Sequence, residues 1–84
     1  MNISKHEQRV LHALAQGGEI RHKRDGARLL EVHCFNREGH RLAEFSQNLF
    51  SRLKRRRLIA SQGGRPYRIT RKGLEAVRAQ LDNR

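Results

Sequence analysis

The amino-acid sequence predicts a single α+β domain spanning residues 1–84, in the order helix, hairpin, helix, hairpin, helix. Three observations support this order. The apolar spacing switches twice from a helical period to the alternation of strands. Two glycine-marked turns, Asp25-Gly26 and Gly63-Gly64, each separate two short extended runs. A chain of 84 residues has room for one small core and little more.

The first helix is expected from Lys5 to Gln16. Ser4 and Glu7 have the S-x-x-E spacing of a capping box, in which each residue satisfies a backbone N–H of the other. Apolar residues then recur at helical spacing, at Val10, Leu11 and Leu14. Gly17-Gly18 follows and predicts the end of the helix.

A first hairpin is expected from two extended runs, residues 20–24 and 27–35. Asp25-Gly26 stands between them and is typical of a tight turn in which both central residues take positive φ. The apolar residues that alternate along the second run are Leu30, Val32 and Cys34. This alternation indicates a sheet with one buried face.

A second helix is expected after a turn at residues 36–39. Its buried stripe consists of apolar residues three, four and four positions apart: Leu42, Phe45, Leu49 and Leu53, extended by Phe50. Ser46 is the N-cap if the helix starts late, and residues 40–44 are then a short strand or the approach to the helix. The opposite face carries amides, a hydroxyl and cations, at Gln47, Asn48, Ser51, Lys54 and Arg55.

A second hairpin and a last helix complete the chain. Residues 58–61 and 67–69 are short strands joined by a turn at residues 62–65, and Pro66 keeps the chain before it extended. Thr70 is the expected N-cap of the last helix, whose apolar stripe is Leu74, Val77 and Leu81. Gly73 costs about 1 kcal/mol against Ala in a helix interior, and less in the first turn. A helix followed by a hairpin is how a winged-helix domain presents both on one side, so we expect a winged-helix-like fold.

The charge is strongly positive and unevenly distributed. The net charge is +11, of which residues 1–45 contribute +2 (eight Lys/Arg, six Asp/Glu) and residues 46–84 contribute +9 (eleven and two). Residues 52–72 hold nine Lys/Arg and no acid. Such a surplus opposes compactness unless a partner neutralises it, and nucleic acid, an acidic protein or an anionic membrane would do so.

This segment predicts a polyanion-binding surface built from nine side chains. Their positions are Arg52, Lys54, Arg55, Arg56, Arg57, Arg65, Arg68, Arg71 and Lys72. These cations would contact phosphates, while the exposed amides and hydroxyl of the second helix would reach base edges or the backbone, or be only solvated. Arg56 and Arg57 have a second explanation, because cations near a helix C-terminus favour the macrodipole. Stacking on single-stranded bases is disfavoured, since Tyr67 is the only tyrosine and tryptophan is absent.

Catalytic and metal-binding patterns are weak. Cys34 and the five histidines show no C-x-x-C or H-x₃-H spacing, and there is no phosphate loop, so we expect no metal and no cofactor. Glu31 and His33 on one strand face are the only nuclease-like pair, and such pairs are usually solvent contacts. The lone cysteine and the polar N-terminus predict a soluble cytoplasmic protein.

Several short stretches, in order from end to end, resemble the YjhX family of small bacterial proteins. They are residues 1–4, 7–9, 14–18, 34–35, 37–39, 66–69, 73–74, 77–80 and 82–84. The resemblance implies a toxin-like component of a toxin–antitoxin pair, with an antitoxin protein as partner and interference with bacterial DNA topoisomerase I as its action. It brings no catalytic residue, so the implied protein is not an enzyme.

The resemblance and the charge together predict a basic binding protein that inhibits a DNA-handling enzyme. The expected partners are DNA topoisomerase I, duplex DNA or both, with no membrane and no small-molecule substrate. One alternative is a DNA-binding transcriptional regulator. A small nuclease is a further alternative from another class.

Overall fold

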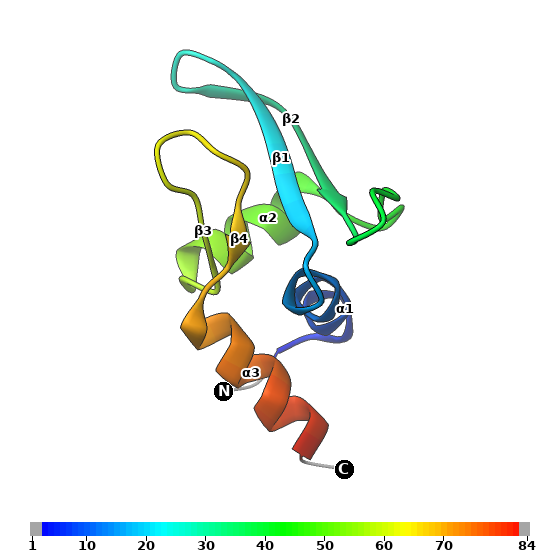
Figure 1. Ribbon diagram of the computed structural model, residues 1–84. Coiled ribbons are helices and arrows are strands. Elements are labelled where there is room, and N and C mark those ends of the chain that lie inside the picture. Colours follow the sequence, from blue (N-terminus) through cyan, green and yellow to red (C-terminus); the bar gives the residue numbers. More distant parts are fainter. Residues whose placement is uncertain (1–2, 83–84) are drawn as a thin grey trace.

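The computed structural model describes residues 3–82, and their side chains as far as residue 78. Its elements are α1 (Lys5–Ala15), β1 (Glu19–Asp25), β2 (Arg28–Phe35), α2 (Gln47–Arg55), β3 (Ile59–Ala60), β4 (Arg68–Ile69) and α3 (Arg71–Asp82). Figure 1 shows the two hairpins rising side by side from a base formed by the helices. The predicted α+β class and the order of elements are confirmed.

The start of α1 is the capping box that the sequence predicts. The backbone N–H of Ser4 donates to Glu7 Oε1 at 2.8 Å, and the N–H of Glu7 donates to Ser4 Oγ at 3.1 Å. The helix ends at Ala15, one residue before the expected end. Gly17 then takes a φ of 110°, which favours glycine because it has no Cβ.

The turn between β1 and β2 differs from the expected one. Asp25 pairs with Arg28 in the ladder, so the two central residues are Gly26 and Ala27. Of these only Gly26 has positive φ, at 61°. The expectation of two positive φ values at Asp25-Gly26 is therefore wrong, and the pattern is that of a turn with glycine in its first central position.

A β-bulge in the same hairpin overturns part of the predicted face. Lys23 pairs with Glu31 but Arg24 pairs with Leu29, which leaves Leu30 as an extra residue in β2. Val32 and Cys34 are buried as expected, but Leu30 is 42% exposed. Leu29 packs against the core in its place, because the extra residue reverses the alternation beyond the bulge.

The segment before α2 is a turn and a short extended return. The N–H of Gly39 donates to the carbonyl of Asn36 at 3.0 Å, as the predicted turn requires. Leu42 then donates to the carbonyl of Cys34 at 2.8 Å. The helix starts late, with Ser46 as N-cap, so Leu42 and Phe45 reach the core from the preceding loop and not from the helix.

The second hairpin is attached to the first through one pair of backbone hydrogen bonds. β3 and β4 pair only at Ile59–Ile69 and Ala60–Arg68, so the strands are shorter than expected. Tyr67 and Ile20 exchange backbone N–H to carbonyl bonds of 2.8 and 2.9 Å. This bridge connects the edge of β1 to the second hairpin.

The last helix packs differently from its predicted stripe. Thr70 caps it as expected, with its hydroxyl accepting from the N–H of Gly73 at 3.1 Å. Val77 and Ala76 are buried, but Leu74 is 39% exposed, and the side chain of Leu81 lies outside the described residues. Gly73 is buried against a neighbouring strand, where a Cβ would overlap the carbonyl oxygen of Leu58. The helix therefore approaches β3 and β4 through its glycine, which rotates Leu74 away from the core.

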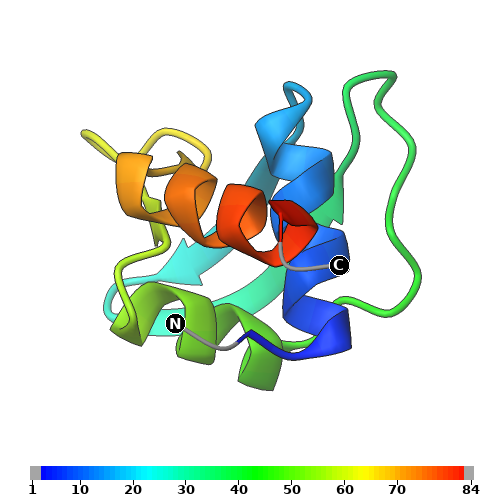
Figure 2. The ribbon, with the colours of Figure 1, turned by 90° about the horizontal axis from the view of Figure 1, so that it is seen from below.

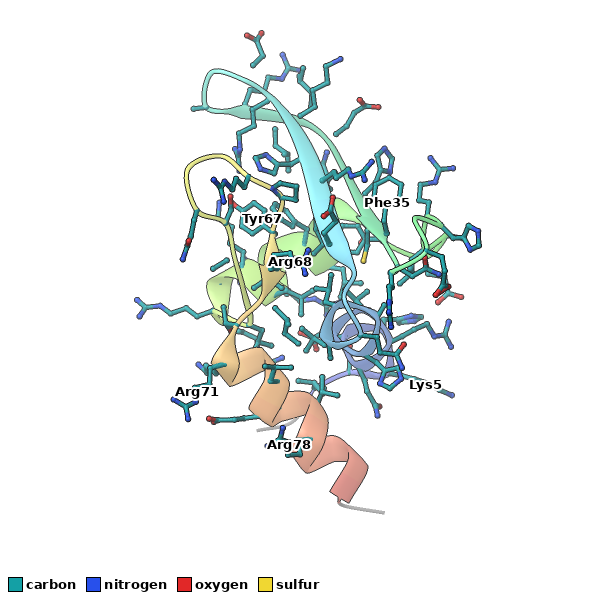
Figure 3. The ribbon with its side chains drawn as sticks, in the orientation of Figure 1. Lys5, Phe35, Tyr67, Arg68, Arg71 and Arg78 are labelled. Carbon is teal, nitrogen blue, oxygen red and sulfur yellow. The ribbon has the colours of Figure 1, made fainter. Side chains whose placement is uncertain are left out.

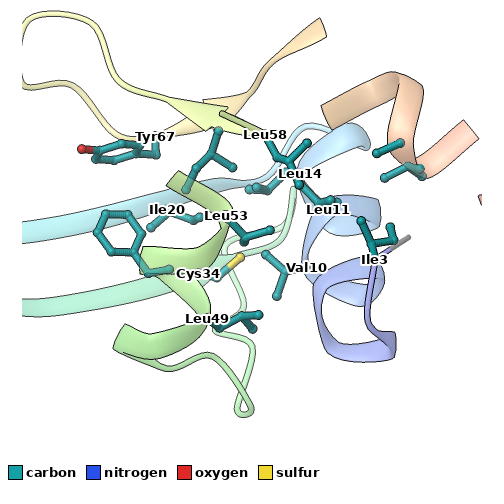
Figure 4. Close-up of a cluster of buried hydrophobic side chains, with 14 of the residues drawn as sticks. Ile3, Val10, Leu11, Leu14, Ile20, Cys34, Leu49, Leu53, Leu58 and Tyr67 are labelled. Atoms are coloured by element: carbon teal, nitrogen blue, oxygen red, sulfur yellow. The ribbon is translucent and has the colours of Figure 1, made fainter. Parts of the chain in front are cut away.

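One core unites these elements. Its largest fully buried side chains come from both hairpins and from two helices: Phe50, Leu11, Leu14, Ile20, Leu53, Leu58 and Cys34. Figure 4 shows how the side chains of α1, α2 and the strands converge on one cluster. Burial of this apolar surface is what holds the helices against the two small sheets.

Candidate nucleic-acid interface

The exposed face of α2 carries the first cations of the predicted surface. The helix turns Leu49, Phe50 and Leu53 inward. The residues between them, Gln47, Asn48, Ser51, Arg52, Lys54 and Arg55, are exposed as expected. No ion pair forms at these cations within the part of the chain that the structure describes. They are available to an external anion.

Arg57 lies at the end of α2 in a conformation that normally belongs to glycine. Its φ is 60°, and it is the only residue other than glycine with positive φ among the described residues. Its N–H donates to the carbonyl of Lys54, and the N–H of Leu58 donates to that of Leu53, both at 3.0 Å. This is the hydrogen-bond pattern of a Schellman motif. The side chain of Arg57 is exposed.

Arg56 is directed away from the exposed cations and toward α1. Its Nη1 donates to Glu7 Oε2 at 2.9 Å, and the side chains are 30% and 4% exposed, respectively. Burial alone would raise the pKa of the Glu7 carboxyl. The two hydrogen bonds with Ser4 and the charge of Arg56 outweigh burial, and they hold this pKa below its ordinary value. Arg56 therefore joins the end of α2 to the start of α1, instead of extending the exposed basic face.

The β3–β4 hairpin adds two arginines beside α2. Arg65 and Arg68 are both exposed, and Arg68 Nη1 lies 3.5 Å from Glu19 Oε1 of β1. With Gln62 and Thr70, they line a concavity of about 390 Å³ on this hairpin. The concavity is polar and cationic, which suits an anionic group.

The start of α3 supplies the last two cations. Arg71 and Lys72 are exposed. Arg71 Nε lies 3.9 Å from Glu75, a distant and solvent-exposed pair that contributes little. No acidic residue lies in the first turn of α3, so this positive helix end is not neutralised there.

Two contacts fix α2 against the second hairpin and the start of α3. Lys54 Nζ lies 6.0 Å from the ring centroids of both Phe50 and Tyr67. Thr70 donates its hydroxyl hydrogen to the carbonyl of Arg57 at 2.8 Å. In Figures 1 and 2 the C-terminal end of α2, the β3–β4 loop and the start of α3 lie on the same side, at the left of both views. Figure 3 shows Arg71 on that side and Lys5 on the opposite one.

Three further cations lie outside the surface that the sequence predicts. Lys23, Arg24 and Arg28 surround the turn of the β1–β2 hairpin and are exposed. The sequence signal for them is three cations within six residues at a turn. Acidic residues elsewhere in residues 1–45 hide it when charge is summed over half the chain.

The geometry gives little support for chemistry at the histidines or the cysteine. His33 Nε2 lies 3.9 Å from Glu31 Oε1 in an exposed pair. Cys34 is buried, and burial raises the pKa of its thiol to about 12. Within residues 3–82 no three His, Cys, Asp or Glu side chains are grouped to hold a metal ion. None of the described helices is both long and apolar enough to cross a membrane.

The fold and this surface define a small, basic α+β protein with an exposed cationic side. Comparison with known proteins gives its family. A family model described as "Putative toxin of bacterial toxin-antitoxin pair" matches residues 1–84. The chain belongs to this family, the YjhX toxin family, which confirms the resemblance in the sequence and implies an antitoxin partner.

Relatives extend over the full length of the chain. A "UPF0386 protein" of Parvibaculum lavamentivorans is 61% identical over 85 positions and one of Beijerinckia indica is 59% identical, each covering all of both chains. A third, from Rhodospirillum centenum, is 60% identical and covers 100% of this chain and 99% of its own. No solved structure matches the chain.

Proposed function

We propose that this toxin-family protein acts as a basic binding protein that inhibits a bacterial DNA-handling enzyme, with DNA topoisomerase I as the first candidate. Family membership supports the toxin role. The observation that carries the binding role is the group of exposed cations on α2, the β3–β4 hairpin and the start of α3. Such a group favours polyanions or an acidic protein surface.

The arrangement of α2 and the second hairpin supports a winged-helix-like presentation by one domain of residues 1–84. α2 leads directly into β3, and the hairpin returns through Tyr67, which bonds to Ile20 just after α1. In this proposal α2 is the helix that faces the partner and the β3–β4 hairpin is the wing. The long β1–β2 hairpin occupies the place between α1 and α2.

The proposed binding side chains are the exposed cations: Arg52, Lys54, Arg55, Arg57, Arg65, Arg68, Arg71 and Lys72. On duplex DNA they would neutralise phosphates and release counterions, so affinity would fall steeply with salt and depend little on sequence. On a protein partner they would contact acidic side chains and mainly raise the association rate. Arg56 is left out, because its guanidinium holds Glu7.

We further propose that the chain has no catalytic activity of its own. The buried thiol of Cys34 and the exposed Glu31–His33 pair offer no activated nucleophile. Supercoiled plasmid and RNA incubated with the protein and Mg²⁺ or Mn²⁺ should stay intact. Cleavage that copurifies with the protein and is lost on changing His33→Ala would establish the nuclease alternative instead.

The test is relaxation of supercoiled plasmid by purified topoisomerase I of the host, with increasing amounts of the folded protein. Inhibition is expected, and excess linear duplex separates its two possible routes. Direct contact with the enzyme should survive the added duplex, whereas crowding of the substrate DNA should be titrated away. If a large excess of protein leaves relaxation unchanged, the topoisomerase proposal fails, and a DNA-binding transcriptional regulator becomes the favoured function.

A further inference from the structure

The distal half of the β1–β2 hairpin extends beyond the core. Ile20 is fully buried at its base, but from Lys23 through Arg28 every residue is exposed. Only Leu29 and His22 anchor this half, as partly buried side chains. A two-stranded ribbon with so little buried surface is marginal by itself. Its length is therefore not explained by the stability of the fold.

The cations of this extension lack carboxylate partners. Lys23, Arg24 and Arg28 form no ion pair in the described structure, although Arg24 Nη1 approaches the carbonyl of Ala27 at 3.4 Å. The nearby Arg21 is different, because it pairs with Glu19 at 2.7 Å. The extension also carries Asp25 and Glu31, so its positive charge depends on the three cations at its end.

The hairpin is bent toward the second hairpin. The bulge at Leu30 lies between the buried base and the tip, where a bulge bends the ribbon and increases its twist. Figure 1 shows the tip curving over the β3–β4 loop, and Figure 2 places both tips on the same side as the end of α2. The edge-on contact of His22 with Tyr67, with ring centroids 5.1 Å apart, holds the two hairpins together.

We propose that the distal β1–β2 hairpin is a second DNA-contacting arm, in which Lys23, Arg24 and Arg28 bind backbone phosphates of a duplex held by α2 and the β3–β4 hairpin. This inference rests on the part of the proposed function in which the basic side binds duplex DNA. Phosphate is the chemistry that fits, because the tip offers cations without aromatic side chains for base stacking. The two hairpins and α2 then surround one length of backbone from three directions.

The test is a fluorescence-anisotropy titration of an unrelated duplex between about 50 and 200 mM salt. The variant Lys23→Ala/Arg24→Ala/Arg28→Ala removes three charges without touching the core. Each lost phosphate contact should lower the slope of log affinity against log salt by about 0.9, so a loss of between one and roughly three is expected. At the low-salt end, affinity should fall about tenfold or more.

A matched control removes the same charge from the opposite side. Lys5→Ala/Arg37→Ala/Arg41→Ala changes three exposed cations on α1 and the following loop, and it should leave the salt slope unchanged. The arm is overturned if the hairpin variant keeps the slope of the unmodified protein, or if the control loses as much. In both cases binding by the unmodified protein would leave the proposed function standing. If that protein binds no duplex at low salt, the arm and the DNA-binding proposal fall together.

Discussion

The ion pair between Glu7 and Arg56 gives the sharpest stability prediction, because one partner is almost fully buried. Truncation by Arg56→Ala removes the donor at 2.9 Å from Glu7 Oε2, while Oε1 keeps its bond from the N–H of Ser4. With 4% of its side chain exposed, the Glu7 carboxylate cannot regain water easily. A hydrogen bond to a charged group contributes about 1.5–3 kcal/mol, and breaking a fully buried pair costs about 3–5 kcal/mol.

The 30% exposure of Arg56 places the expected loss near the lower of these ranges, at about 2 kcal/mol. Urea unfolding followed by circular dichroism measures it, with Arg55→Ala as the control, because Arg55 lies on the exposed face of the same helix. The control should change stability by less than about 0.5 kcal/mol. Equal stability of the two variants would refute the structural role of Arg56.

The same pair predicts a pH dependence. Because the folded pKa of Glu7 is depressed, its stabilisation is present above its ordinary value of 4.5 and is lost as pH falls through the folded pKa. Glu7→Gln can keep the capping box but not the charge, so it should cost about 1 kcal/mol at neutral pH. The difference from the unmodified protein should shrink at acid pH. A difference that stays constant down to the acid transition would contradict the depressed pKa.

Three further predictions concern packing and reactivity. Gly73→Ala should lower the free energy of unfolding by about 1–3 kcal/mol, despite the better helix propensity of alanine, because its Cβ would overlap the Leu58 carbonyl; urea unfolding would show a gain if propensity dominated. Arg57→Gly should raise stability by about 0.5–1 kcal/mol in the same assay, because glycine takes the positive φ without strain, and a loss would mean that the arginine side chain stabilises the fold. Cys34 should react with a thiol reagent at pH 8 only as fast as the protein opens, and a rate equal to that in urea would contradict its burial and its pKa of about 12.

Features set by neighbouring residues could be predicted from the sequence. The capping box of Ser4 and Glu7, the cap at Ser46 and the cap at Thr70 all depend on hydrogen bonds that span three residues. The turn glycines were located correctly for the same reason. Local chemistry of this kind decides where elements start and stop, before any tertiary contact forms.

Features set by distant contacts could not be predicted. Arg56 is held by Glu7, 49 residues earlier in the chain, and nothing in the local run of cations separates it from Arg55. The bulge at Leu30 had no signal either, because Leu29 and Leu30 are alike and only the packing decides which one faces inward. Gly73 looks like a minor helix defect in the sequence, but it permits a close approach to β3.

The candidate surface lies between these two cases. The clustering of cations in residues 52–72 is a property of composition, so the sequence identified the elements that carry it. Their placement on one side follows from the Tyr67–Ile20 bridge and the Thr70–Arg57 hydrogen bond. The cations of the β1–β2 tip were missed, since they join the same side only through the bend of that hairpin.

The most direct test of the central claim is capture of the partner from a lysate of the native host, with the folded protein immobilised and the lysate treated with nuclease. A variant with Arg52→Ala, Lys54→Ala and Arg55→Ala is the comparison, because these three side chains are exposed and leave Glu7 paired. The account predicts that mass spectrometry finds topoisomerase I on the unmodified protein at moderate salt, and that the variant loses it. Absence of topoisomerase I from the nuclease-treated sample, or its equal recovery on the variant, would contradict inhibition through this basic surface.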